Sequence, residues 1–413
     1  MPEASSKNKA GLRGLHRNIW VLTVTSFLTD ISSEMIINLI PLFLTSVLQA
    51  GTAVVGLIEG LAETTASLMK IFSGALSDRL GKRKGLAVIG YGLSALSKPF
   101  LYFAQFLGWG GILGVRIADR LGKGIRTSPR DAMLAGSVNE KNRGLGFGVQ
   151  RAGDTAGAFL GLAVAALVIW LTQTNPEVLS ARTFQVAVLV SILPAGLAVL
   201  VLGLVGQEVA PKKKSESVLL SFKGLDRRFI LYLVVSIIFT LGNSSDAFII
   251  LLAKERGLSI LQVIFMLMTF NAVYAILSGP AGGLSDRIGR RKLILIGWLT
   301  YGLIYLGFAF SKTGTNVWIL FGLYGIYYAL TAGAGKAIIA DLVPDEKRGT
   351  AYGLYAASLG IAAFPASAIA GVLWQGIGGW PGFGPSAPFF FGAALAVLAG
   401  LLFAAWVREP LRK

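Results

Sequence analysis

The chain alternates long apolar runs with short polar turns. A run of about 20 apolar residues is long enough to cross a lipid bilayer as a helix. On this pattern we predict twelve spans, over residues 18–46, 53–75, 85–107, 110–134, 144–171, 183–205, 229–253, 258–280, 293–311, 316–340, 350–375 and 388–407. The pattern is typical of an all-α membrane protein of twelve transmembrane helices.

The two sets of six spans carry the same motifs in the same order. Gly-Ala-Leu-Ser-Asp-Arg-Leu-Gly-Lys-Arg-Lys at 74–84 returns as Gly-Gly-Leu-Ser-Asp-Arg-Ile-Gly-Arg-Arg-Lys at 282–292. The runs 32–34 and 244–246, and the turns 139–144 and 344–349, also correspond. We therefore expect two parallel repeats related by an axis along the membrane normal. They divide the chain into an N-terminal segment 1–17, a bundle 18–206, a linker 207–228, a bundle 229–407 and a tail 408–413.

Composition narrows the class of protein. The 413 residues are 54% hydrophobic and only 14% charged, whereas a soluble protein is about a quarter charged. There is no cysteine and one histidine, His16, so we expect no metal site, no cofactor and no catalytic triad.

The net charge of +17 lies mostly in turns on one side of the predicted spans. This asymmetry predicts an integral protein of a prokaryotic cytoplasmic membrane, with both termini and the linker in the cytoplasm, and it argues against nucleic acid as the partner.

With these motifs the chain resembles the major facilitator superfamily over nearly its whole length. The repeated turn matches the signature of that family between spans two and three, and Arg120-Leu121-Gly122-Lys123-Gly124 is similar to its span-four signature. The glycine-spaced antiporter motif of span five is matched in part, by Gly144, Gly153, Gly157 and Gly161, while Ala158 and Leu162 replace its proline and its last glycine. The resemblance implies two pseudo-symmetric six-helix bundles, a cavity lined mainly by spans 1, 4, 7 and 10, and alternating access. It also implies a proton-coupling role for Arg120.

The repeated turns and the cytoplasmic end of span four are candidate gate elements. Their basic residues either fix the topology alone or, as the resemblance favours, belong with Asp78 to a salt-bridge latch that breaks between two conformations. The predicted gate residues are Gly74, Asp78, Arg79, Arg83, Arg126, Arg130, Asp131, Arg143, Asp286, Arg287 and Arg348.

Charges inside the predicted spans are candidates for proton coupling. Asp30 and Glu34 lie one turn apart in span one, where mutual repulsion favours a bound proton; the alternative is an ion pair with span four. Span four carries charges at three- and four-residue intervals, which face protein or a cavity because lipid cannot solvate them. The coupling and cavity candidates are Asp30, Glu34, Arg116, Asp119, Arg120, Lys123, Arg151 and Asp154.

Two further sets of charges have simpler expected roles. Glu59 and Glu63 in span two, with Lys70 near the same face, are expected to be solvated or paired with another helix. Arg151 and Asp154 in span five are expected to pair with span four, with Gly153 and Gly157 allowing the two helices to approach closely.

The second half carries less charge and more aromatic residues. Its candidates for substrate contact are Asn243, Asp246, Asn271, Tyr324, Tyr327, Tyr328 and Lys336. For the tyrosines, simple packing inside the bundle is the alternative.

These features together predict a secondary transporter that works as a monomer and exports a small organic molecule, anionic or amphipathic, in exchange for protons. No phosphate-binding loop is present, so ATP is not expected to drive it. Two alternatives stay open: an importer or symporter of an ion, metal chelate or metabolite, and a non-transporting membrane receptor or assembly subunit. No catalytic constellation indicates an enzyme.

Overall fold

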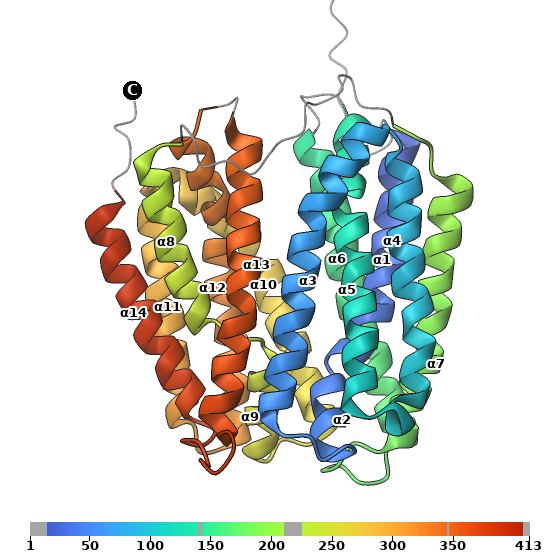
Figure 1. Ribbon diagram of the computed structural model, residues 1–413, viewed down its shortest axis with the longest axis vertical. Helices are drawn as coiled ribbons and strands as arrows, with labels where there is room; N and C mark the ends of the chain where they lie inside the picture. The colour runs from blue at the N-terminus through green and yellow to red at the C-terminus, as the bar shows by residue number, and fades with distance from the viewer. Residues whose placement is uncertain (1–14, 139–142, 210–224, 345–346, 408–413) are drawn as a thin grey trace, which may run out of the picture.

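The computed structural model describes residues 15–138, 143–209, 225–344 and 347–407, and nearly all of these residues lie in long helices (Figure 1). In chain order the helices are α1 (Arg17–Ile37), α2 (Ile40–Ser46), α3 (Thr52–Leu80), α4 (Arg83–Ser97), η2 (Lys98–Phe103), α5 (Ala104–Gly136), α6 (Arg143–Thr172), α7 (Ala181–Leu200), η4 (Val201–Val205), α8 (Arg227–Gly242), α9 (Ala247–Glu255), α10 (Ile260–Ile288), α11 (Arg290–Phe310), α12 (Gly314–Leu342), α13 (Arg348–Gln375) and α14 (Ala387–Trp406).

The helices of the described ranges make twelve passes. Within the described ranges, ten helical segments are long and apolar enough to cross a membrane. One of them, Arg83–Gly136, reverses at Gly108, whose φ of 64° breaks the helix, and so counts as two passes. The 29-residue α3 supplies the twelfth pass, although its charges, Glu59, Glu63 and Lys70 among them, lower its hydropathy. The predicted all-α fold of twelve membrane helices is confirmed.

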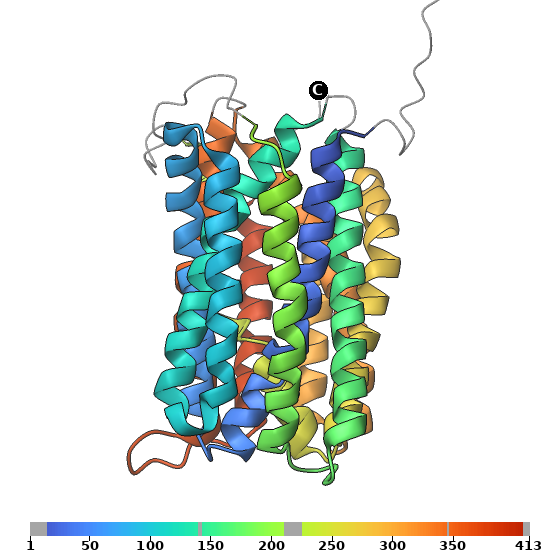
Figure 2. The same ribbon diagram turned by 90° about the vertical axis from the view of Figure 1, so that its right-hand side faces the viewer.

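The passes form two bundles that stand side by side (Figure 1). The first contains α1 to η4 and the second α8 to α14, and in Figure 2 the first bundle stands in front of the second. We call the end of the molecule where α1 begins and α14 ends the terminal face, and the other end the opposite face. The first bundle ends at Val205 and the second begins at Arg227.

Two spans that the sequence pattern presents as continuous are broken, and each break lies nearer the opposite face than the terminal face. The first pauses at Asn38 and Leu39 before α2, because Pro41 in the first turn of α2 has no N–H to continue the ladder. The seventh pauses from Asn243 to Asp246, between α8 and α9. Interrupted backbone at membrane depth is tolerated where it borders a polar cavity, and both breaks border the cavity described below.

The repeated turn is tight because of its glycines. Gly81 ends α3 with a φ of 65°, and Gly289 joins α10 to α11 with a φ of 91°. Residues with a Cβ rarely adopt this left-handed conformation. Both copies of the turn therefore require glycine at this position.

The expected pairing of span five with span four is wrong. The glycines of α6 face α1: a Cβ on Gly157 would lie 2.4 Å from the carbonyl oxygen of Phe27, and one on Gly161 would lie 2.6 Å from that of Ile31. This surface of α6 is flat, so the two backbones meet directly. Arg151 and Asp154 line a cavity between the bundles, which Arg130 and Asp131 of α5 also line.

The two bundles are tied together mainly between the membrane centre and the opposite face. There, the Lys254 ammonium lies 2.6 Å from the Glu177 carboxylate. The Thr64 hydroxyl donates to the Gly360 carbonyl at 2.6 Å. Three further hydrogen bonds on this side join Ile260 to Pro176, Thr52 to Gly371 and Ala53 to Gln375.

Nearer the terminal face, the described residues contribute a single hydrogen bond between the bundles, from Arg151 to Tyr274 at 2.9 Å. The structure is thus closed at the opposite face.

Candidate functional site

A polar cavity of about 530 Å³ lies between the bundles, next to the two helix breaks. Its charged lining within the described chain is acidic throughout: Glu34, Glu59, Glu63 and Asp246. Asn243, Asn271 and Tyr328, three of the predicted substrate contacts, also line it. We call this space the central cavity. Because Glu34 comes from α1 and Asp246 from the break between α8 and α9, each bundle contributes a carboxyl group to the same space.

The carboxyl groups of α1 do not form an ion pair with α5. Glu34 accepts a hydrogen bond of 2.9 Å from the Asn38 side chain, at the helix break. Asp30, one turn earlier, is half-buried and does not border the central cavity. Neither carboxylate has a basic group within ion-pair distance among the residues that are placed, so the structural alternative considered for this pair is not observed.

The basic stripe of α5 is buried inside the first bundle, and its partner is α3. Arg116 is 3% exposed and lies 2.6 Å from the Glu59 carboxylate. The interhelical pairing expected for Glu59 is confirmed. Asp119 lies 4.0 Å from Arg116 and 3.6 Å from Arg120, which is itself buried. These side chains form a charge cluster behind the wall of the central cavity.

The rest of the stripe turns to other neighbours. Arg126 donates to the Ser94 hydroxyl at 2.6 Å and lies over the Tyr91 ring, 4.7 Å from its centroid. This residue was expected at the cytoplasmic gate, but it is packed within the first bundle against α4. Lys123 is half-buried on the same helix.

The aromatic residues of α12 divide between packing and cavity. Tyr324 is fully buried and donates to the Asn243 side chain at 3.3 Å, which fixes the break in the seventh span. Tyr327 stacks on Tyr324 and is 7% exposed. Tyr328 lines the central cavity. The packing alternative therefore describes Tyr324, whereas Tyr328 is placed to contact a bound molecule.

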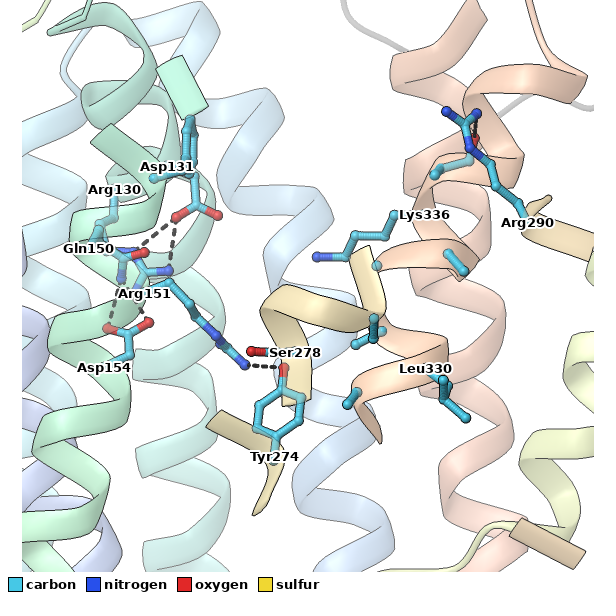
Figure 3. Close-up of a pocket in the computed structure, with 17 residues that line it drawn as sticks. Arg130, Asp131, Gln150, Arg151, Asp154, Tyr274, Ser278, Arg290, Leu330 and Lys336 are labelled. Carbon is cyan, nitrogen blue, oxygen red and sulfur yellow. Dashed lines mark hydrogen bonds and ion pairs between the residues drawn. The ribbon is translucent and has the colours of Figure 1, made fainter. Parts of the chain in front are cut away.

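A larger cavity, of about 790 Å³, lies between the bundles toward the terminal face (Figure 3). We call it the vestibule. Its charged lining consists of Arg130, Asp131, Arg151, Asp154, Arg290 and Lys336. A third cavity of about 250 Å³ shares Lys336 with the vestibule and Asn243 and Tyr328 with the central cavity. The three spaces follow one another along α12.

The predicted gate residues lie in several different places. Arg130 and Asp131 form an ion pair of 2.9 Å at the vestibule. Gly74 packs close to Ser128, which would lie 3.4 Å from a Cβ there. Arg79 and Arg287 are exposed.

Two of the gate arginines bind backbone or linker groups. The Arg348 guanidinium donates to the Ala340 carbonyl at 2.9 Å, and the Arg83 amide donates to Glu208 at 2.8 Å. The side chains of Asp78, Asp286 and Arg143 lie outside the described residues, so the latch stays a prediction.

Four functional candidates were missed by the sequence interpretation: Lys98, Gln150, Tyr274 and Arg290. Lys98 is 5% exposed and its ammonium donates to the hydroxyls of Ser32 and Ser33. A lone lysine in an apolar span was a signal that could have identified it. Gln150 donates to Asp154 at 2.7 Å, a contact that the four-residue spacing allows.

The carboxyl groups named for the alternative of a cation carrier meet only in part, because Glu34 and Asp246 line the central cavity and Asp30 does not. Asp30, Glu34 and Asp246 belong to no group of three or more metal-ligating side chains in the part of the chain that the structure describes.

Two parallel bundles with broken helices around a buried polar cavity, closed at one membrane face, are the architecture of a membrane transporter. The family model of the Major Facilitator Superfamily matches residues 22–250 and 228–413, and the chain belongs to this family. It is therefore a membrane transporter of a small molecule and not an enzyme.

Relatives and solved structures of this family cover nearly the whole chain. An uncharacterised MFS-type transporter of Methanocaldococcus jannaschii is 37% identical over 402 residues, which are 96% of each chain. A multidrug resistance efflux pump PmrA homologue of Lactococcus lactis is 25% identical and covers 86% of this chain and 89% of its own. Among solved structures, the nucleoside transporter NupG has a TM-score of 0.77 at 14% identity, covering 94% of this chain and 100% of its own. At that identity the likeness concerns the fold alone.

Proposed function

We propose that this transporter exports a small amphipathic organic molecule in exchange for protons. The observation that carries the proposal is the pair of carboxyl groups, Glu34 and Asp246, that the two bundles contribute to one central cavity. A carboxylate in a membrane interior is costly unless it is protonated, paired or wet. Neither Glu34 nor Asp246 has an ion-pair partner among the described residues, so both are available to bind protons.

The coupling follows from mutual exclusion in the central cavity. When the cavity communicates with the terminal face, Glu34 and Asp246 are free to hold a cargo through polar or charged contacts. When the bundles rock and the cavity communicates with the opposite face, protons entering from that side neutralise the same groups and displace the cargo. Each full cycle then moves cargo one way and protons the other.

The charge of the central cavity bears on the nature of the cargo. Glu34 and Asp246, which have no ion-pair partner among the described residues, repel a free anion at that depth. Phe270, Phe321 and Tyr328 offer apolar contact area. We therefore favour an amphipathic molecule whose neutral or cationic part occupies the centre. The efflux pump among the relatives supports the outward direction.

The proposal also includes the membrane and the assembly. The basic turns after α3 and α10 support a cytoplasmic terminal face in a prokaryotic inner membrane. Each chain encloses its own complete cavity, which supports function as a monomer.

The test is transport into inverted vesicles under an imposed pH gradient. A panel of amphipathic dyes that includes the cation ethidium and the anion fluorescein would be offered to wild-type vesicles. We expect gradient-dependent accumulation of at least one dye, lost in Glu34→Gln and in Asp246→Asn. The matched control is Glu255→Gln, which removes a carboxylate from an exposed position near the opposite face and is expected to leave accumulation unchanged. Accumulation that ignores the gradient, or persists in both cavity variants, would overturn the proposal.

A further inference from the structure

The vestibule contains two cations, one from each bundle, that no carboxylate neutralises within the described chain. Arg151 projects from α6 and Lys336 from α12, and both point into the space between the bundles (Figure 3). The other two cations of the lining are paired, Arg130 with Asp131 and Arg290 with Asp341. Asp154, the remaining carboxylate of the lining, is held by the Gln150 amide.

Arg151 is positioned by an aromatic side chain of the other bundle. One guanidinium nitrogen donates to the Tyr274 hydroxyl at 2.9 Å, and the guanidinium lies 5.7 Å from the centre of the Tyr274 ring. A guanidinium has five N–H donors. The described residues use one of them, so a planar edge with several donors still faces the vestibule.

The helical turn that carries Lys336 is anchored on three sides. The carbonyl of Gly335 accepts from Tyr232 at 3.1 Å, that of Lys336 from Tyr352 at 2.9 Å, and that of Ala337 from Arg290 at 3.1 Å. These donors come from α8, α13 and α11. The backbone at Lys336 is thus held by three neighbouring helices of its bundle, while its ammonium makes no hydrogen bond to a placed residue.

We propose that Arg151 and Lys336 form a subsite for an anionic group, a carboxylate or phosphate, on a small organic molecule. Two cations on opposite walls, each carried by an anchored side chain or helical turn, are suited to a group with several acceptor oxygens. The apolar side chains of Phe147 and Leu330 line the same cavity and accommodate the organic part. This inference rests on the proposed transport function and specifies one end of its cargo.

The subsite and the central cavity differ in charge and lie along one path. Lys336 and Tyr328 are eight residues apart on α12, a rise of about 12 Å. A cargo with an acidic group at one end and a neutral or cationic group at the other would match the basic vestibule and the acidic centre together. The anionic character considered from the sequence is then a property of one end of the molecule.

The test measures binding to the full chain in nanodiscs of phosphatidylcholine, without any proton gradient. The probe is 2-naphthoate, and the neutral 2-naphthamide is its matched analogue. Calorimetry is expected to show naphthoate binding that weakens at least about tenfold in Arg151→Gln and in Lys336→Gln, since each removes a charged hydrogen bond. Binding should also weaken with added salt, and the amide should bind at least about tenfold less well.

Control variants distinguish a loss of charge at the subsite from a loss of folding. The design also distinguishes failure of the subsite from failure of the transport mechanism. Arg182→Gln and Lys312→Gln remove exposed cations near the opposite face and should bind naphthoate like the wild type. Lys336→Arg keeps the charge and should bind within a few-fold of it. Equal binding of acid and amide, binding indifferent to both glutamine variants, or a loss in Lys336→Arg as large as in Lys336→Gln would overturn the subsite. Because no gradient is present, these results stand apart from those of the vesicle experiment.

Discussion

The ion pair between Arg116 and Glu59 shows how this protein keeps a charged stripe within a membrane. The Arg116 side chain is 4% exposed and that of Glu59 is 11% exposed, with 2.6 Å between them. Removing one member leaves the other charge buried without compensation, which costs about 3–5 kcal/mol. Replacing both by apolar residues of similar volume is much less costly.

We therefore predict that Glu59→Ala lowers the free energy of unfolding by about 3 kcal/mol or more, seen as a large fall in the melting temperature in detergent. The double variant Glu59→Leu with Arg116→Met should recover most of that loss. Similar melting temperatures for the single and double variants would contradict a stabilising role for the pair.

At the residue level, the sequence predicted that charged side chains inside the spans need partners. It did not predict which residues those partners are. The spacing on α5 placed Arg116 and Arg120 on one face, and burial of both confirms it. The choice of Glu59 over Asp30 or Glu34 depends on how α3 and α5 pack, which no local spacing encodes. Gln150 and Tyr274 were missed because a neutral side chain in a bundle gives no electrostatic signal.

At the level of the helices, the contact between α6 and α1 depends on glycine. A Cβ on Gly157 would lie 2.4 Å from the Phe27 carbonyl oxygen, so any larger residue forces the two helices apart. Gly148, on the same helix, has no neighbour within 4 Å of a Cβ placed there. The two positions are a matched pair, because both are helical glycines of α6 but only Gly157 is tightly packed.

Gly157→Ala is accordingly expected to lower the free energy of unfolding by about 1–3 kcal/mol through overpacking. Gly148→Ala should be neutral or slightly stabilising, since alanine favours a helix over glycine. Melting temperatures in detergent compare the two directly. Equal effects at both positions would show that backbone propensity, and not the contact with α1, decides the stability of α6.

The length of the apolar runs predicted where the membrane-spanning helices lie, but it did not predict where two of them are interrupted. The predicted spans 85–107 and 110–134 meet where the chain reverses at Gly108. The break at Asn38 has a local cause in Pro41, but the break from Asn243 to Asp246 contains no proline. There, tertiary contacts interrupt the helix. One of them is the hydrogen bond from Tyr324 to Asn243, two residues that lie far apart in the sequence.

For the whole molecule, the internal repeat predicted two parallel halves, and the family resemblance implied two bundles with a cavity between them. Neither could predict the conformation. The same residues must support a state closed at the opposite face and a state closed at the terminal face. Their difference lies in contacts between bundles, such as Lys254 with Glu177 and Thr64 with Gly360. The charge of the two cavities could not be predicted from the sequence either, because it depends on which face of each helix meets the other bundle.

The central claim is that Glu34 and Asp246 exchange protons for cargo in one cavity. The most direct measurement is proton movement evoked by cargo alone, in proteoliposomes with a pH indicator inside and no imposed gradient. Adding a dye that the vesicle experiment identifies should produce a proton flux opposite in direction to dye movement, and that flux should vanish in the double variant Glu34→Gln with Asp246→Asn. Dye movement with no proton flux in the wild type, or an undiminished flux in the double variant, would contradict the account.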